Sequence, residues 1–156
     1  MKTLDFTQLK NVKNVVAELQ QLLADFQVFY TNLRGFHWNI KGKEFYALHA
    51  KFEEMYDNTA EKADAIAERI LMLGETPAHN FSEYLKIARI KEIGYVSCGD
   101  KAGENILETL KTIMEAERKL METAAEISDE ATSALMSGYI CEQEKTIWML
   151  VAYFSK

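Results

Sequence analysis

Two pairs of potential metal ligands lie fifteen residues apart in one stretch of this sequence. His49 precedes Glu53 by four residues, and Asp64 precedes Glu68 by the same interval. Residues four apart share one face of a helix, so each pair can offer two ligands to a single ion. Imidazole nitrogens together with carboxylate oxygens suit iron and other first-row divalent ions. His37, one of only three histidines, is the fifth candidate ligand because it ends the preceding helical pattern.

The acidic residues around these pairs could also form an ordinary solvated face, since Asp and Glu are mostly exposed in proteins. The arrangement of charges favours the metal site instead. At 100° per residue, one stripe of this segment contains His49, Glu53, Asp57, Glu61, Asp64 and Glu68, whereas the far side carries Lys51, Asn58, Lys62 and Arg69. A plain solvated helix mixes its charges, and this segment separates acid from base.

The spacing of the two pairs constrains how they can be used. Fifteen residues of straight helix are about 22 Å long, so one ion cannot be bound by both pairs of one chain. Either the pairs serve separate sites, or a two-fold axis brings His49 and Glu53 of one copy opposite Asp64 and Glu68 of another. An antiparallel crossing of two copies near residue 58 would achieve the second arrangement. The spacing permits both and mildly favours the intersubunit site.

Apolar periodicity predicts four long helices that would position these residues. Residues recurring at intervals of three and four indicate helices from Leu9 to Phe36, about Glu44 to Leu73, Ser97 to about Ile127, and about Glu130 to Phe154. Gly74 and Pro77 stop the second helix, and Asp129 is the expected cap of the last. Ser97 has capping-box spacing and is expected to cap the third helix.

A short helix is predicted in the long connection between the second and third helices. Asn80 and Glu83 form a capping-box pattern at its start, and the helix should run from Phe81 to about Arg89. The residues between Leu73 and Val96 can span the length of a bundle. The sequence therefore predicts an all-α four-helix bundle with one crossover connection, in a single domain covering residues 1–156.

Composition excludes several classes of protein. The net charge is -6, which disfavours nucleic-acid binding through the overall field and suits the handling of cations. Cys98 and Cys141 have no CxxC partner, so a disulfide framework or a zinc-thiolate site is not expected. The N-terminal segment is too polar for a secretory signal, and no apolar run reaches membrane length. We expect a cytoplasmic protein with reduced thiols.

The sequence resembles the Dps family, the mini-ferritin branch of the ferritin-like proteins. The residues that carry the resemblance extend over most of the chain: His37-Trp38, Gly42, Phe45-x-x-Leu48-His49-x-x-Phe52-Glu53, Asp64-x-x-Ala67-Glu68-Arg69-Ile70, Gly74-Glu75-x-Pro77 and Glu144-Lys145-x-x-Trp148. The family often has Asp where this chain has Glu53. The longer carboxylate should still bind metal.

The resemblance implies a ferritin-like fold and a ferroxidase. It implies a hollow homododecamer that oxidises Fe(II) with hydrogen peroxide, or more slowly with oxygen, and stores ferric oxide. Carried over residue by residue, the catalytic iron site would take His37, His49 and Glu53 from one subunit, and Asp64 and Glu68 from its neighbour. It also places Trp38 near the iron, where the indole could take up stray oxidising equivalents. His79, in contrast, is expected to be a surface residue.

Two departures from the family pattern bear on partners. Many members bind DNA through a lysine-rich N-terminal tail, whereas here only Lys2 and Lys10 precede the helical periodicity and Asp5 offsets one of them. We therefore expect weak or absent DNA binding. The family's acidic iron-entry pore often has Asp where Ala134 stands, although the nearby acidic residues could keep such a pore negative; these are Glu126, Asp129 and Glu130.

Two other functions are less consistent with the sequence. A di-iron oxidoreductase with its metal inside one bundle needs Glu-x-x-His on two helices, and that motif is absent. A DNA-compacting protein with incidental metal binding would need the basic surface that this acidic chain lacks.

Overall fold

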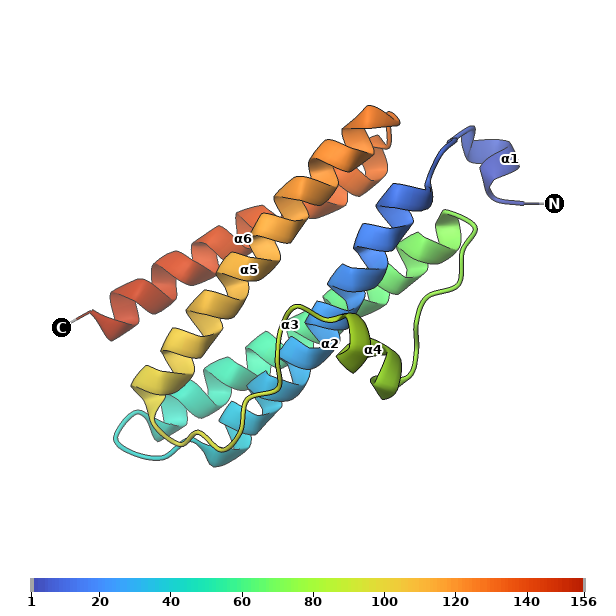
Figure 1. Cartoon of the computed structure of the whole chain (residues 1–156). Coiled ribbons are helices and arrows are strands. Elements are labelled where there is room, and N and C mark those ends of the chain that lie inside the picture. Colours follow the sequence, from blue (N-terminus) through green and yellow to red (C-terminus); the bar gives the residue numbers. More distant parts are fainter. Residues whose placement is uncertain (1, 156) are drawn as a thin grey trace.

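The computed structural model describes residues 2–155, which form six helices. Four of these are long and make two antiparallel pairs, α2 (Lys13–Asn39) with α3 (Phe45–Met72), and α5 (Gly99–Glu126) with α6 (Glu130–Phe154). Figure 1 shows the pairs lying side by side along one bundle axis. The predicted four-helix bundle is confirmed. Within residues 2–155, no helix combines the length and apolar character needed to span a membrane.

The connection between α3 and α5 runs the length of the bundle and carries α4 (Phe81–Ile87), as predicted (Figure 1). Gly74 ends α3 with a φ of +83°, a conformation that glycine adopts without a steric penalty. The capping box of α4 is present, because the Asn80 side chain accepts from the backbone of Glu83 while the Glu83 carboxylate accepts from the backbone of Asn80. The pattern Asn-x-x-Glu therefore predicted the start of this helix correctly.

Buried polar side chains of α2 hold the rest of the crossover in place. Asp25 is fully buried, and its carboxylate accepts hydrogen bonds from the backbone N–H groups of Arg89 and Ile90 at 2.6 and 3.1 Å. The Arg89 guanidinium also pairs with Asp25 at 2.7 Å. Asn32 donates to the carbonyl of Lys91 and accepts from the N–H of Ile93. Backbone groups that would otherwise lack partners are thus satisfied by α2.

Two predicted helix starts are wrong. The first long helix begins at Lys13 rather than Leu9, after the separate short helix α1 (Leu4–Thr7). Gln8 and Asn11 have φ values of 59° and 60°, which break the helix, while Val12 still packs into the core and so extends the apolar pattern. The N-cap residue of α5 is Cys98, and its side chain makes no capping hydrogen bond. Ser97 therefore lies outside the N-cap position and does not cap this helix.

The basic side of α3, opposite the acidic stripe, is largely covered in the structure. Lys62 and Arg69 are buried, and each makes an ion pair that links α3 to α6 or to its N-cap residue. Lys51 is half-buried and pairs with Glu54 on its own helix. The far side of α3 packs toward the bundle because the second helix pair lies over it.

Arg69 and Asp129 form the most completely buried of these pairs. The Arg69 guanidinium lies 2.6 Å from the Asp129 carboxylate and donates to the Thr132 hydroxyl at 2.9 Å. Asp129 caps α6, accepting from the Thr132 N–H at 3.0 Å. Burial alone would raise the pKa of Asp129, but the hydrogen bonds from Arg69 and Thr132 and the Arg69 charge lower it. Asp129 therefore joins two helices and is not available to an acidic pore.

Replacing Arg69 with Met should lower the free energy of unfolding by about 3–5 kcal/mol, because it leaves the Asp129 charge buried without a partner. A pKa lowered by folding stabilises the protein above the unfolded-state pKa, and this contribution disappears as the pH falls through the folded-state value. The deficit of the variant should therefore shrink in acid. Urea denaturation of the native protein and the variant, at one protein concentration and several pH values, measures this difference in the free energy of unfolding. The exposed Lys86→Met change is the control, and an equal effect of both changes would contradict the prediction.

Candidate metal centre

The antiparallel pairing of α2 and α3 brings two histidines face to face. His37 lies near the end of α2 and His49 near the start of α3, so the five-residue turn between these helices places them opposite each other. Their rings stack with centroids 3.7 Å apart and planes inclined by 19°. Potential ligand atoms of His37, His49 and Glu53 lie within 4.8 Å of one another. Three of the five predicted ligands are therefore brought together within one chain.

Reciprocal hydrogen bonds orient both imidazole rings. Nδ1 of His37 lies 2.7 Å from the backbone carbonyl of His49, and Nδ1 of His49 lies 2.8 Å from the carbonyl of His37. A carbonyl oxygen only accepts, so each Nδ1 carries a proton, and in the neutral imidazole Nε2 is then the nitrogen with the lone pair. Metal-binding histidines are commonly held in this way, with the second ring nitrogen donating to a carbonyl. The two Nε2 atoms are thus prepared to bind a cation.

Aromatic side chains restrict the movement of the histidine pair. The Phe45 ring stacks on His49 at a centroid distance of 4.9 Å, and Tyr56 meets His37 edge-on at 5.4 Å. His37 is buried and His49 is half-buried, whereas Glu53 is exposed. The carboxylate can therefore move toward an ion while the imidazoles remain in place. Motifs had singled out the ligands, but not Phe45 or Tyr56 as residues that position them.

Asp64 and Glu68 lie apart from the three-residue cluster. Both are exposed on α3, more than two turns beyond Glu53, and within residues 2–155 neither forms an ion pair or a side-chain hydrogen bond. The chain therefore presents two separate groups of candidate ligands, or half-sites, and α3 keeps its two ligand pairs too far apart to bind one ion, as predicted.

The remaining singled-out residues lie on the surface. His79 is exposed, as predicted, and so are Cys98 and Cys141, which are free thiols. Trp38 and Trp148 are 65% and 67% exposed, so neither is a core residue of the single chain. The Trp38 ring instead packs over the Arg34 guanidinium at 4.8 Å. An exposed indole beside a half-site is consistent with a surface that a second protein chain covers.

Comparison with known proteins shows the family to which this fold belongs. The model of the ferritin-like domain matches residues 16–156. The DNA protection during starvation protein of Porphyromonas gingivalis is 51% identical over 157 residues, which cover 99% of each chain. The chain belongs to the Dps family of ferritin-like proteins. The bundle described above is accordingly the ferritin-like fold predicted from the sequence.

Solved structures of Dps proteins share this fold over nearly the whole chain. The Dps protein of Vibrio cholerae O1, described as a member of a broad superfamily of ferritin-like diiron-carboxylate proteins, superposes with a TM-score of 0.90 at 48% identity, covering 92% of this chain and 90% of that one. Dps from Staphylococcus aureus gives a TM-score of 0.90 at 32% identity, with 94% and 99% covered. These structures establish the fold and the family.

Replacing His49 with Ala should weaken Zn²⁺ binding by at least about tenfold, because it removes one Nε2 ligand and the ring that stacks on His37. Calorimetric titration of the metal-free protein measures this loss. His79→Ala is the matched control, since it removes an exposed imidazole outside the cluster, and it should leave the affinity unchanged. Equal affinities in both variants and the native protein would remove His49 from the metal centre.

Proposed function

We propose that this protein is an iron-storing ferroxidase whose catalytic centre is shared between two copies of the chain. In this proposal His37, His49 and Glu53 of one subunit bind iron together with Asp64 and Glu68 of the other. The observation that supports it most directly is the pair of imidazoles whose Nε2 lone pairs are oriented by reciprocal hydrogen bonds. Family membership and the exposed, unpaired carboxylates of the second half-site support it further.

A two-fold axis across α3 explains why each chain carries two half-sites. Antiparallel packing of two copies would place the histidine end of each α3 beside the carboxylate end of the other, which completes two identical centres. Such packing would also cover exposed apolar side chains near the centre, including Trp38. Further apolar side chains are exposed around α4, where Phe81 and Leu85 line a small groove of about 170 Å³ with Arg34.

The proposed reaction uses Fe(II) as a substrate and hydrogen peroxide, or more slowly oxygen, as the oxidant. Two Fe(II) ions each give one electron to hydrogen peroxide, and two protons complete two water molecules. Because both electrons go to one peroxide, no hydroxyl radical is released. The histidines hold Fe(II), and the carboxylates provide the oxygen ligands that neutralise the increased charge of Fe(III). The indole of Trp38 would intercept oxidising equivalents that escape.

The product would be stored inside a closed homododecamer in the cytoplasm. The net charge of -6 per chain favours the approach of cations. Glu126 and Glu130 are exposed at the α5–α6 turn and could line an acidic entrance, in which Ala134 takes no part. Removal of iron and peroxide would limit oxidative damage to DNA without contact with DNA.

Mixing two inactive variants tests the shared centre. His49→Ala and Glu68→Ala should each slow peroxide-driven Fe(II) oxidation by at least about tenfold, because each loses a ligand. In a random mixture of subunits, half of the dimers are mixed, and each mixed dimer has one intact centre. About a quarter of the centres should therefore recover. Stopped-flow absorbance of Fe(III) formation measures the rate.

The control for this experiment is Glu61→Ala, which removes an exposed carboxylate of the same stripe outside both half-sites and should leave the rate unchanged. Native mass spectrometry of the mixture should show assemblies of twelve chains containing both variants. If activity does not recover in assemblies shown to be mixed, the centre lies within one subunit and the shared site is wrong.

Binding of duplex DNA should be weak or absent at physiological salt. Affinity for DNA depends on the number of phosphate contacts, and the basic residues of α3 are buried or paired. Lys2 and Lys10 are exposed, but Asp5 accepts a hydrogen bond from the Lys2 backbone and offsets its charge. A gel-shift titration with chelated metal at about 0.15 M salt measures binding. Retarded DNA at submicromolar protein would show that another surface replaces the basic tail.

A further inference from the structure

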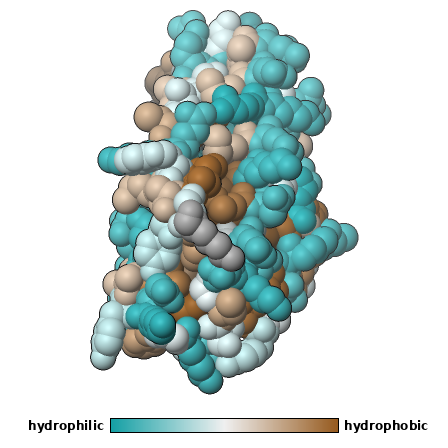
Figure 2. Space-filling view, turned by 90° about the vertical axis from the view of Figure 1, so that its left-hand side faces the viewer, coloured by the Kyte–Doolittle hydropathy of each residue, from teal (hydrophilic) through white to brown (hydrophobic). Residues whose placement is uncertain are grey.

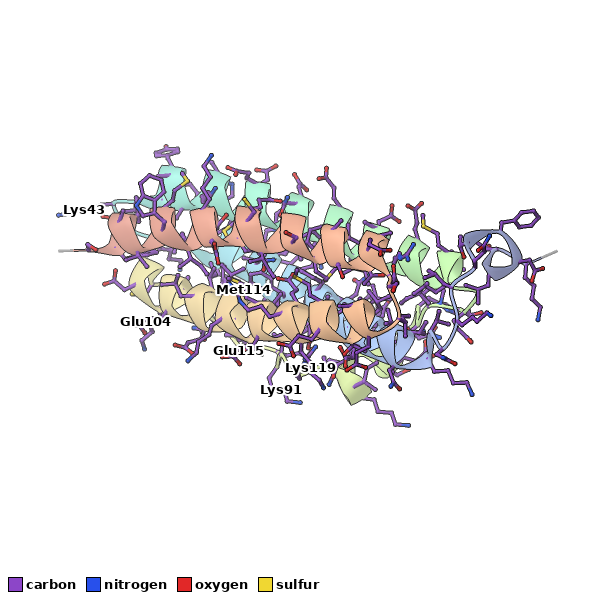
Figure 3. The ribbon with its side chains drawn as sticks, turned by 90° about the horizontal axis from the view of Figure 1, so that it is seen from above. Lys43, Lys91, Glu104, Met114, Glu115 and Lys119 are labelled. Carbon is purple, nitrogen blue, oxygen red and sulfur yellow. The ribbon has the colours of Figure 1, made fainter. Side chains whose placement is uncertain are left out.

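A carboxyl group of α5 is buried inside the bundle. Hydrophilic residues mostly lie on the surface, as Figure 2 shows for the end of the bundle at which α6 terminates. In Figure 3, Glu104, Glu115 and Lys119 likewise point outward from α5. Glu117 of the same helix is instead 0% exposed. Ionisable groups this deeply buried are rare unless they are paired, so Glu117 requires an explanation.

The direct partner of Glu117 is a neutral amide. Gln143 of α6 is itself 4% exposed, and its Nε2 lies 2.8 Å from each of the two Glu117 oxygens. Burial raises the pKa of Glu117 to about 7, although the Gln143 hydrogen bond and the charges of Lys62 and Arg118 act in the opposite direction. Both protonation states of this carboxyl group are therefore populated at neutral pH.

The two cations that act on Glu117 have closer partners of their own. Nζ of Lys62, on α3, lies 3.1 Å from the Glu142 carboxylate. The Arg118 guanidinium, on α5, lies 2.7 Å from the Glu144 carboxylate. Within residues 2–155 neither cation forms an ion pair with Glu117. The charge of Glu117 is thus only partly balanced by these cations.

The remaining titratable groups around Glu117 do not neutralise it either. Tyr139 of α6 stays an uncharged phenol, because burial and the charges of Glu117 and Glu142 raise its pKa. On α2 the buried carboxylate is that of Asp25, and it pairs with Arg89 of the crossover. Neutralisation of Glu117 therefore falls to a proton.

The amide of Gln143 also lacks a contact that a proton can supply. Its Oε1 is buried and accepts no hydrogen bond from residues 2–155. A buried carbonyl oxygen without a donor is costly. An ionised carboxylate only accepts and cannot serve Oε1, whereas a protonated carboxyl group has one O–H to donate. The neutral form of Glu117 is therefore the better match for this amide.

We propose that Glu117 and Gln143 form a proton-operated link between α5 and α6. When the carboxyl group binds a proton, its O–H donates to Oε1 of Gln143, while Nε2 still donates to the other carboxyl oxygen. Rotations about the side-chain torsions of Gln143 bring Oε1 to this position, and the terminal torsion of a glutamine is broad. The acid and the amide then satisfy each other with two hydrogen bonds.

This link makes one contact of the bundle stronger in mild acid. Because folding raises the pKa of Glu117 from 4.5 to about 7, its contribution to stability is complete below the unfolded-state value and is lost as the pH rises through the folded-state value. Asp129 responds in the opposite sense, since folding lowers its pKa. Acidification therefore tightens the α5–α6 contact at Gln143 while it weakens the contact of Arg69 with the cap of α6.

Infrared difference spectroscopy of the assembled protein tests the link, because a protonated carboxyl group has a C=O band separate from that of a carboxylate. Ordinary surface carboxyl groups, with pKa values of about 4, are ionised above about pH 6. As the pH rises above this value, the native protein should lose one carboxyl band per chain, with a midpoint of about 7. The Glu117→Gln variant should lack this band.

The matched control is Glu115→Gln, which changes an exposed carboxyl group of the same helix and should leave the band unchanged. Gln143→Leu should move the band to higher frequency, because the O–H loses its acceptor; Gln143→Met replaces this variant if it does not fold. A native protein without a titrating band above about pH 6 would overturn the proposal. So would a native band at the frequency of a carboxyl group that donates no hydrogen bond, or a band unchanged by loss of the Gln143 amide.

Discussion

The two hydrogen bonds that His37 and His49 exchange with each other's backbone carbonyls are the contact on which the candidate metal centre depends. They link α2 to α3 beside the turn and use Nδ1 of each ring, which leaves both Nε2 atoms as the candidate ligands. The rest of the geometry follows from the straightness of α3. Because that helix carries Asp64 and Glu68 away from the histidines, the candidate ligands of a single chain fall into two separate groups, and the proposed centre therefore uses a second copy of the chain.

Buried charges organise the remainder of the bundle, and each is satisfied by a different element. Asp25 of α2 holds the crossover, Arg69 of α3 joins the cap of α6, and Lys62 lies between α3 and α6. Such groups are costly to remove from water, and alternative registers would leave them unpaired. Their distribution provides a physical reason for a single arrangement of the four helices, since the apolar contacts alone are less directional.

Local patterns in the sequence predicted the helices well where one short-range interaction decided the outcome. The capping box of Asn80 and Glu83, the Asp129 cap and the stop at Gly74 all appear in the structure. Prediction failed where periodicity and backbone conformation disagreed. Leu9 and Val12 continue the apolar pattern, but positive φ angles at Gln8 and Asn11 interrupt the helix. The Ser97 spacing was misleading because α5 starts one position later without a side-chain cap.

By itself, the sequence determined which residues could bind metal, because ligand chemistry depends on residue type. It also determined that the candidate ligands on the second long helix cannot all bind one ion, because helical rise and spacing fix their separation. Only the tertiary structure decided which nitrogen of each histidine is free, since that depends on carbonyls brought across the α2–α3 turn. It likewise decided the role of the basic side of α3. The spacing of Lys62 and Arg69 placed them opposite the acidic stripe without showing what covers them, and the second helix pair lies over them and pairs their charges inside the bundle.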